Sequence, residues 1–178
     1  MNAQPAGSFV LALHGHMPWV LHHGRWPHGE HWLFEAVVGV YLPILSVLDE
    51  LSSARVKGSM SLGLTPVLLE QLRHPTLRKG LDHYLADLVR RARDDGHDAV
   101  LKDRALEWER TFSGLQALWD RIDGDIVGAF AYHARAGDIE LLSSFATHGY
   151  APLLKHDRCI RAQLETGLRT SERHLGFR

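Results

Sequence analysis

The chain has 178 residues, of which 45% are hydrophobic and 23% charged, and its formal net charge is −1. This composition is typical of one globular domain with a buried core, and a charge near zero argues against nucleic acid and anionic membranes as partners. The single cysteine excludes a disulfide within the chain and indicates a reducing compartment, and the apolar run at residues 9–13 is too short to span a membrane. We therefore expect a cytoplasmic protein.

The first predicted strand covers residues 8–13, SFVLAL. Its nearly continuous apolar run is of the kind found where both faces of a parallel strand are covered. His14 and His16 follow directly and are expected at the carboxyl end of that strand. The spacing of apolar residues then predicts a helix over residues 32–51, which Pro43 kinks or divides in two.

Two further strands are predicted, separated by a long helical region. The second strand covers residues 56–64 and ends in Leu-Thr-Pro, and the third covers residues 139–150 and ends in Thr-His-Gly. Between them, residues 66–135 carry helical spacing throughout, and a last amphipathic helix places apolar residues between 160 and 175 on one face. The chain order is therefore strand, helix, strand, helical insertion, strand, helix.

This alternation of strands and helices predicts an α/β fold built on a parallel sheet with right-handed crossovers. Three strands cannot close a barrel, and a complete barrel of this kind takes about 250 residues. We therefore expect residues 1–178 to form the N-terminal portion of a single barrel domain that continues in a longer protein.

Three histidines follow predicted strands of this sheet: His14 and His16 after the first, and His148 at the end of the third. Ligands of parallel sheets bind where the carboxyl ends of the strands meet, and alternation along an extended segment lets His14 and His16 face the same pocket. Three interpretations stay open here. The His-x-His pair could bind a metal, the rings could hydrogen-bond a polar substrate such as a sugar, or they could satisfy neighbouring backbone groups.

Aromatic residues near the first strand favour a sugar over a metal. Trp19, Trp26 and Trp32 lie in or beside the loop that follows it, and flat rings with a polar edge suit the C–H faces of glucose units. Packing at the start of a helix is an alternative role for Trp32. No acidic residue with clear metal-ligand spacing accompanies the histidines, and the acids near these strand ends are Glu30, Glu35 and Glu140.

Four motifs occur in order along the chain: VLALHGHMPWV, GRWPHGEHWLFEAVVGVYLPIL, SLGLTPVLLEQL and GDIELLSSFATHGYAPLL. Together they resemble the start of glycoside hydrolase family 57, and GRWPHGE and WLFEA look most like its 1,4-alpha-glucan branching enzymes. His14-Gly15-His16 matches the first motif of that family, and His148-Gly149 matches the second.

The resemblance implies an incomplete (β/α)7 barrel, with the helical insertion between its second and third strands, and a retaining reaction on α-1,4-glucans such as glycogen and amylose without a cofactor or metal. Retaining chemistry needs two carboxyl groups roughly 5–5.5 Å apart. In this family the glutamate nucleophile follows a Trp-x-Pro-Glu stretch and the aspartate acid/base comes much later, so both would lie beyond Arg178. No catalytic residue is therefore assigned, and we expect the 178-residue chain alone to be inactive.

By the same transfer, the substrate-binding residues are His14, His16 and His148, together with Trp19 and Trp32. The resemblance gives no role to Glu35 or Glu140 and no oligomeric state. Two alternatives stay open: a metal-dependent hydrolase that uses the His-x-His pair, and a non-catalytic remnant that only binds glucan.

Overall fold

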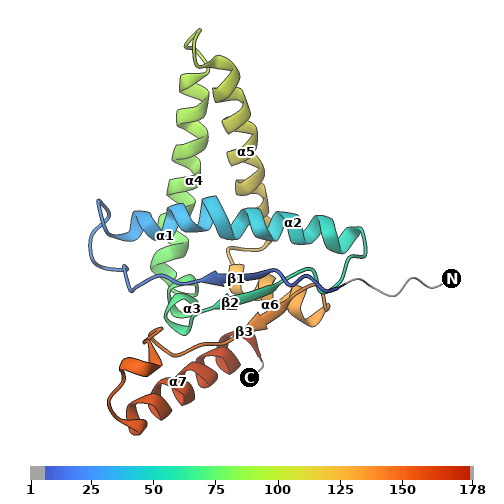
Figure 1. Cartoon of the computed structure of the whole chain (residues 1–178). Coiled ribbons are helices and arrows are strands. Elements are labelled where there is room, and N and C mark those ends of the chain that lie inside the picture. The colour runs from blue at the N-terminus through green and yellow to red at the C-terminus, as the bar shows by residue number, and fades with distance from the viewer. Residues whose placement is uncertain (1–6, 177–178) are drawn as a thin grey trace, which may run out of the picture.

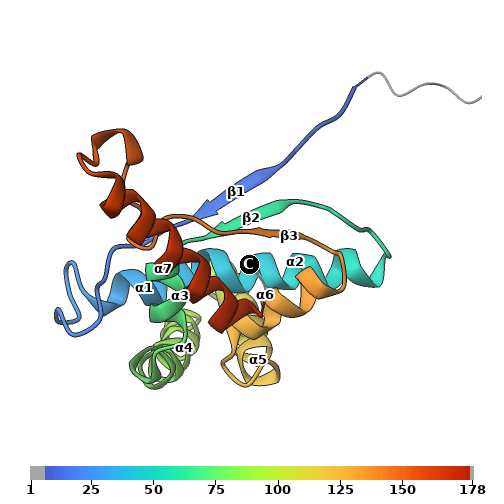
Figure 2. The same cartoon turned by 90° about the horizontal axis from the view of Figure 1, so that it is seen from below.

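A computed structural model describes residues 7–176 and contains a small parallel sheet with helices against one face. The strands are β1 (Ala12–Gly15), β2 (Ser61–Leu64) and β3 (Glu140–Leu142), in the order β1-β2-β3. Figure 2 shows the three strands lying along a layer of helices that includes α1, α2 and α6. The predicted α/β fold with a parallel sheet is therefore confirmed.

The helices cover the stretches between and after the strands (Figure 1). They are α1 (Glu30–Ala36), the π-helical turn η1 (Val37–Tyr41), α2 (Leu42–Ser53), α3 (Pro66–Leu72), α4 (Pro75–Asp95), α5 (Lys102–Arg121), α6 (Ile126–Arg135), the 3-10 turn η2 (Ala151–Leu153) and α7 (Asp157–Leu175).

The predicted helix around Pro43 is one continuous segment, Glu30–Ser53, with a π-helical turn just before the proline. Pro43 lies in the first turn of α2, where its missing N–H is tolerated because the π-helical turn shifts the hydrogen-bonding pattern. By length and composition alone, the segment could cross a membrane. Of its apolar 18-residue stretch, 44% is buried inside the protein. Leu33, Phe34 and Leu42 are completely buried in the core. Core helices of soluble proteins can have the same length and hydropathy.

The sheet has one covered face and one open face, which corrects the prediction of a strand buried on both sides. Leu62 and Leu64 of β2 are buried, whereas Leu142 of β3, which pairs with Gly63, is 40% exposed. The first strand begins at Ala12 and contains His14 instead of ending before it, and the exposed Phe9 and Val10 precede it. The apolar run was misleading because helices cover only one side of the sheet.

The helical insertion between β2 and β3 is confirmed, and its α4–α5 pair projects away from the sheet as a long hairpin (Figure 1). Leu81, Leu85 and Val89 of α4 are buried, in agreement with the helical spacing predicted for residues 66–135. The last helix differs from its prediction. Its C-terminal end buries Ser171 and Leu175, whereas Leu164 and Leu168 of the same predicted face are exposed, because the half of α7 near its start extends past the sheet.

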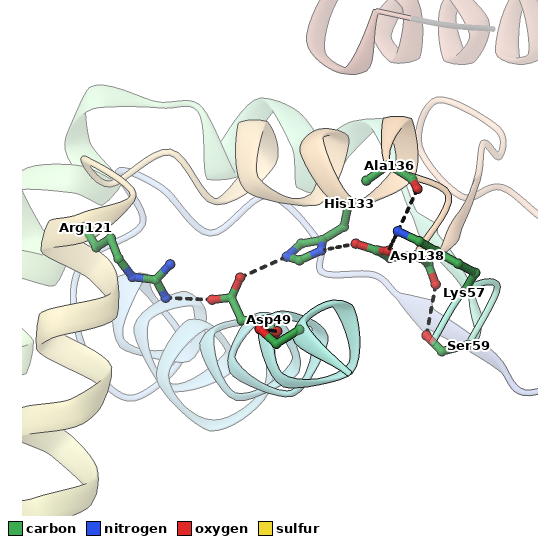
Figure 3. Close-up of polar contacts among 8 residues, drawn as sticks. Asp49, Lys57, Ser59, Arg121, His133, Ala136 and Asp138 are labelled. Atoms are coloured by element: carbon green, nitrogen blue, oxygen red, sulfur yellow. Dashed lines mark hydrogen bonds and ion pairs between the residues drawn. The ribbon is translucent and has the colours of Figure 1, made fainter. Parts of the chain in front are cut away.

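A charged network around the buried His133 and Asp138 joins the helices to the strands at the amino end of the sheet (Figure 3). His133 of α6 lies between two carboxylates, with Nδ1 2.9 Å from Asp138 and Nε2 3.4 Å from Asp49. Arg121 donates to Asp49 at 2.6 Å, and Lys57 donates to Asp138. The network therefore connects α2, α5 and α6 to the segments that lead into β2 and β3.

Asp138 makes this network sensitive to acid. The hydrogen bond from Lys57, reinforced by His133, lowers the pKa of Asp138 from its ordinary 3.8 to about 2. A carboxyl group with a depressed pKa stabilises the folded state above its ordinary pKa, and that stability is lost as the pH falls toward the folded value. We expect the urea midpoint of the chain to fall between about pH 4 and pH 2, and Asp138→Asn to flatten this fall. Equal pH slopes for the two proteins would contradict the assignment.

Candidate functional site

Three histidine rings from separate parts of the sequence form one cluster at the carboxyl end of the sheet. The ring centroid of His148 lies 4.5 Å from that of His14 and 4.4 Å from that of His16. The His14 and His16 centroids are 6.4 Å apart, with ring planes inclined by 24°. All three residues are exposed, so the cluster faces solvent on the open side. The structure thus brings together the three histidines singled out in the sequence.

His14 is placed by the register between β1 and β2. It pairs with Gly63, and a Cβ built on Gly63 would lie 3.1 Å from Nδ1 of His14. A side chain at position 63 would therefore press on the imidazole. Because Gly63 has no side chain, the His14 ring has room to lie across the open face of the sheet.

His16 follows β1 and is held by the end of β2. Its Nδ1 lies 3.2 Å from Oγ1 of Thr65, and the N–H of Thr65 donates to the carbonyl of Gly15 at 3.1 Å. Partial burial lowers the pKa of His16, and the neighbouring rings of His148 and His14 lower it further. His16 therefore favours the neutral imidazole, which offers one donor and one acceptor.

His148 does not end a strand, contrary to the sequence prediction. Strand β3 stops at Leu142, and His148 lies in the following loop with a left-handed φ of 57°. Helix α7 holds this loop: the N–H of Thr147 donates to Oε1 of Gln163 at 2.9 Å, and the N–H of Ala146 donates to the Gln163 carbonyl at 3.2 Å. The loop pairs with α7 instead of extending the sheet.

Gly167 of α7 sets how closely this loop can approach. A Cβ at Gly167 would lie 2.2 Å from the carbonyl oxygen of Ser144. We expect Gly167→Ala to reduce the free energy of unfolding by about 1–3 kcal/mol, as overpacking does, and to displace the loop that carries His148. Urea denaturation measures the first effect.

Gly114→Ala on α5 is the matched control, because a Cβ there has no neighbour within 4 Å. It is expected to stabilise the chain by about 0.4–1 kcal/mol. Equal stabilities of the two variants would show that the loop does not pack on α7 as described.

The two predicted tryptophans lie outside the ring cluster. The indole N–H of Trp19 donates to the Leu21 carbonyl at 3.0 Å, and the Trp19 ring contacts His74 edge-on. Trp32, near the start of α1, contacts the ring of His28 at 4.8 Å. Both are partly exposed, at 42% and 39%, and neither has a ring contact with the three histidines in the part of the chain described.

The two acids without a predicted role also lie apart from each other. Glu140 of β3 accepts a hydrogen bond from the hydroxyl of Ser61 at 2.9 Å on the open face of the sheet. Glu35 of α1 lines a separate pocket together with Trp26 and Tyr84. The structure gives these carboxylates no common position and so no paired acid.

The three rings lie close enough together to hydrogen-bond one ligand. Within residues 7–176, no group of three or more histidine, cysteine or acidic side chains is placed to hold a metal ion. The ring plane of His14 is inclined by 24° to that of His16 and by 30° to that of His148. Beside His148 lies a pocket of about 590 Å³, lined by Phe145, Tyr150 and exposed leucines of α7.

Sequence reasoning missed the residues that support the cluster. Thr65 and Gln71 are completely buried at the two ends of α3. Oε1 of Gln71 accepts from the N–H of Val20 at 2.8 Å, and its amide donates to the Pro18 carbonyl at 3.1 Å, which pins the loop after His16. Little in the sequence signalled them: Gln71 follows Glu70 in a helix whose other residues are apolar, and Thr65 directly precedes a proline.

The sequence matches the model of glycosyl hydrolase family 57 over residues 10–178. It is 35% identical over 173 residues to 1,4-alpha-glucan branching enzyme TK1436 of Thermococcus kodakarensis, covering 97% of this chain and 26% of that protein. Probable 1,4-alpha-glucan branching enzyme Rv3031 of Mycobacterium tuberculosis is 35% identical over 158 residues, covering 86% and 28%. The chain thus spans about a quarter of the length of these relatives.

Two solved structures also have folds similar to that of this chain. A glucose complex of the branching enzyme from Thermococcus kodakaraensis superposes with a TM-score of 0.89 at 35% identity, over 95% of this chain and 31% of that one. The α-amylase AmyC of Thermotoga maritima gives 0.83 at 26% identity, over 94% and 33%. The fold is therefore similar in both, and the sequence is more similar to the branching enzyme.

Proposed function

The chain belongs to glycosyl hydrolase family 57, and on that basis we propose that His14, His16 and His148 bind the hydroxyl groups of an α-1,4-glucan as part of a 1,4-alpha-glucan branching enzyme. The observation that carries the proposal is the convergence of these rings within 4.4–6.4 Å of one another. Each neutral imidazole offers a donor and an acceptor, which matches a sugar hydroxyl that can do both.

The partner is a linear α-1,4-glucan such as amylose or the outer chains of glycogen. The apolar pocket beside His148 adds Tyr150 and Phe145, and a ring with one polar edge suits the alternating faces of a glucose unit. Trp19 and Trp32, partly exposed near the start of the chain, belong to the same substrate-binding role, at glucose units beyond the one that the histidines hold.

The sheet is the N-terminal part of a (β/α)7 barrel, and residues 1–178 belong to that one domain. Leu142 of β3 supports this, because it is exposed and lies in register with Gly63 and His14, on the face that would line the barrel interior. Leu164 and Leu168 of α7 are apolar and exposed in the same way. Exposed apolar side chains on a strand and on a helix are expected where another part of the protein covers them.

Catalysis requires groups that this chain does not supply. A retaining reaction uses a nucleophilic carboxylate and an acid/base carboxylate roughly 5–5.5 Å apart, one of which forms the glycosyl-enzyme. Glu140 accepts a hydrogen bond from Ser61, whereas Glu35 lines a separate pocket with Trp26 and Tyr84, so the two form no such pair. We infer that the chain alone binds glucan without branching it, and that a longer protein containing it would act in the cytoplasm on a storage glucan.

Affinity electrophoresis tests the binding part of this proposal. The purified 178-residue chain is run in native gels that contain amylose, and in matched gels that contain a β-1,4-linked glucan. We expect amylose alone to retard the chain. Migration without retardation in both gels would contradict the proposal. The same retardation by amylose and by the β-1,4-linked glucan would also contradict it.

Two measurements decide between the proposal and its alternatives. Formation of α-1,6 branches in amylose by a longer protein that contains this chain supports a branching enzyme, whereas binding without branching favours a glucan-binding remnant. Stoichiometric zinc in the purified protein that is lost in His16→Ala would favour a metal-dependent hydrolase instead.

A further inference from the structure

Thr65 lies between the end of β2 and the start of α3, and its hydroxyl contacts the His16 ring of the cluster. Its side chain is completely buried, and its backbone N–H already donates to the Gly15 carbonyl. The hydroxyl makes one hydrogen bond within residues 7–176, to Nδ1 of His16 at 3.2 Å. The hydroxyl makes no capping bond to the start of α3, so the imidazole is its partner.

The direction of this hydrogen bond follows from the free-energy cost of burying a hydroxyl donor without an acceptor. If Nδ1 of His16 donated, the hydroxyl proton of Thr65 would be buried with no acceptor among the described residues. A buried donor without a partner costs about 1–3 kcal/mol, whereas a hydroxyl oxygen that donates and leaves lone pairs unused costs less. The hydroxyl therefore donates and Nδ1 accepts.

The charge state of His16 agrees with this direction. Nδ1 can accept only in the neutral ring, and burial together with the neighbouring His148 and His14 lowers the pKa of His16. Since Nδ1 carries no proton in that ring, Nε2 must carry it. Nε2 has no hydrogen-bond partner within the part of the chain described, and the residue is exposed, so this N–H is available to a ligand.

We propose that Thr65 is a positioning residue that holds His16 as the neutral Nε2–H tautomer, so that the ring presents a hydrogen-bond donor to a sugar oxygen. The assignment of the ligand rests on the proposed function, whereas the tautomer rests on the hydrogen bond between the buried Thr65 hydroxyl and His16. Without the Thr65 hydroxyl, the His16 ring could flip about χ2 or change tautomer. Nε2 would then not be held as a donor.

Nitrogen-15 NMR of the full chain, labelled at histidine, tests the proposal. The His16 ring signals are identified by their loss in His16→Gln. We expect a protonated Nε2 and an unprotonated Nδ1 in the wild-type chain and in Thr65→Ser, which keeps the hydroxyl. Thr65→Val keeps the shape without the hydroxyl, and we expect it to give mixed tautomers and a higher His16 pKa, because the donor that favoured the neutral ring is gone.

A protonated Nδ1 in the wild-type chain would overturn the proposal, and so would an unchanged His16 spectrum in a folded Thr65→Val. If circular dichroism finds that Thr65→Val does not fold, the wild-type and Thr65→Ser spectra still decide the tautomer. Titration with maltoheptaose separates the two claims. We expect about two- to tenfold weaker binding in Thr65→Val, whereas no binding by any variant, with the tautomer as expected, would refute only the glucan assignment.

Discussion

Replacing His14 and His16 together by alanine is expected to weaken the binding of a linear α-1,4-glucan by about 1–3 kcal/mol, or roughly 5- to 150-fold. The two rings supply adjacent hydrogen-bonding groups in one exposed cluster, and alanine supplies none. The double variant also leaves the buried hydroxyl of Thr65 without its partner, so we expect the free energy of unfolding to fall by about 1–3 kcal/mol as well. Isothermal titration with maltoheptaose measures the first quantity, and urea denaturation the second.

His97→Ala is the matched control for this double variant, because His97 is exposed in the connection between α4 and α5, far along the chain from the cluster. It should bind glucan as the unchanged chain does. In a longer protein that contains this chain, the double variant should also slow branching of amylose. An undiminished branching rate would refute the role given to the two imidazoles.

Phe34→Ala is expected to have the largest effect on stability, a loss of about 3–5 kcal/mol in the free energy of unfolding. Phe34 is completely buried where α1 packs against α4, and its ring lies 5.6 Å from that of Tyr84. Opposite the ring stands Gly80, on which a Cβ would lie only 2.3 Å from Cζ of Phe34. With no side chain at Gly80 to relax inward, the cavity left by alanine stays open.

Phe9→Ala removes the same side chain from a position that is 89% exposed, and it should change stability by less than about 0.5 kcal/mol. A second control uses the cavity itself. Gly80→Ala should destabilise the unchanged chain by about 1–3 kcal/mol, yet cost much less in the Phe34→Ala background, where its methyl group has room. Additive effects of Phe34→Ala and Gly80→Ala would contradict the packing described here.

The meeting of the histidines could be predicted because it depends on topology more than on exact boundaries. Parallel strands in neighbouring positions bring their carboxyl ends to one edge, so side chains after β1 and near the end of β3 converge even when the strand limits are wrong. His148 illustrates this point. It lies in a loop held by Gln163 instead of at a strand end, and its ring still lies against those of His14 and His16.

The supporting residues could not be predicted, because their roles depend on contacts between distant segments. Gly63 is significant only because the register sets His14 beside it, and Thr65 only because His16 turns toward it. His133 appeared as one of 13 histidines in the sequence. Its burial between Asp49 and Asp138 results from the packing of α6 between α2 and the start of β3, which apolar spacing does not specify.

The most direct test of the account is to titrate the histidine-labelled chain with maltoheptaose and follow the ring signals of His14, His16 and His148 by NMR. The account predicts that the three sets of signals move together along one saturable curve, while the signals of His97 and His133 stay in place. Movement of none of the three, or saturation at a site that leaves them unchanged, would show that the cluster does not bind the glucan.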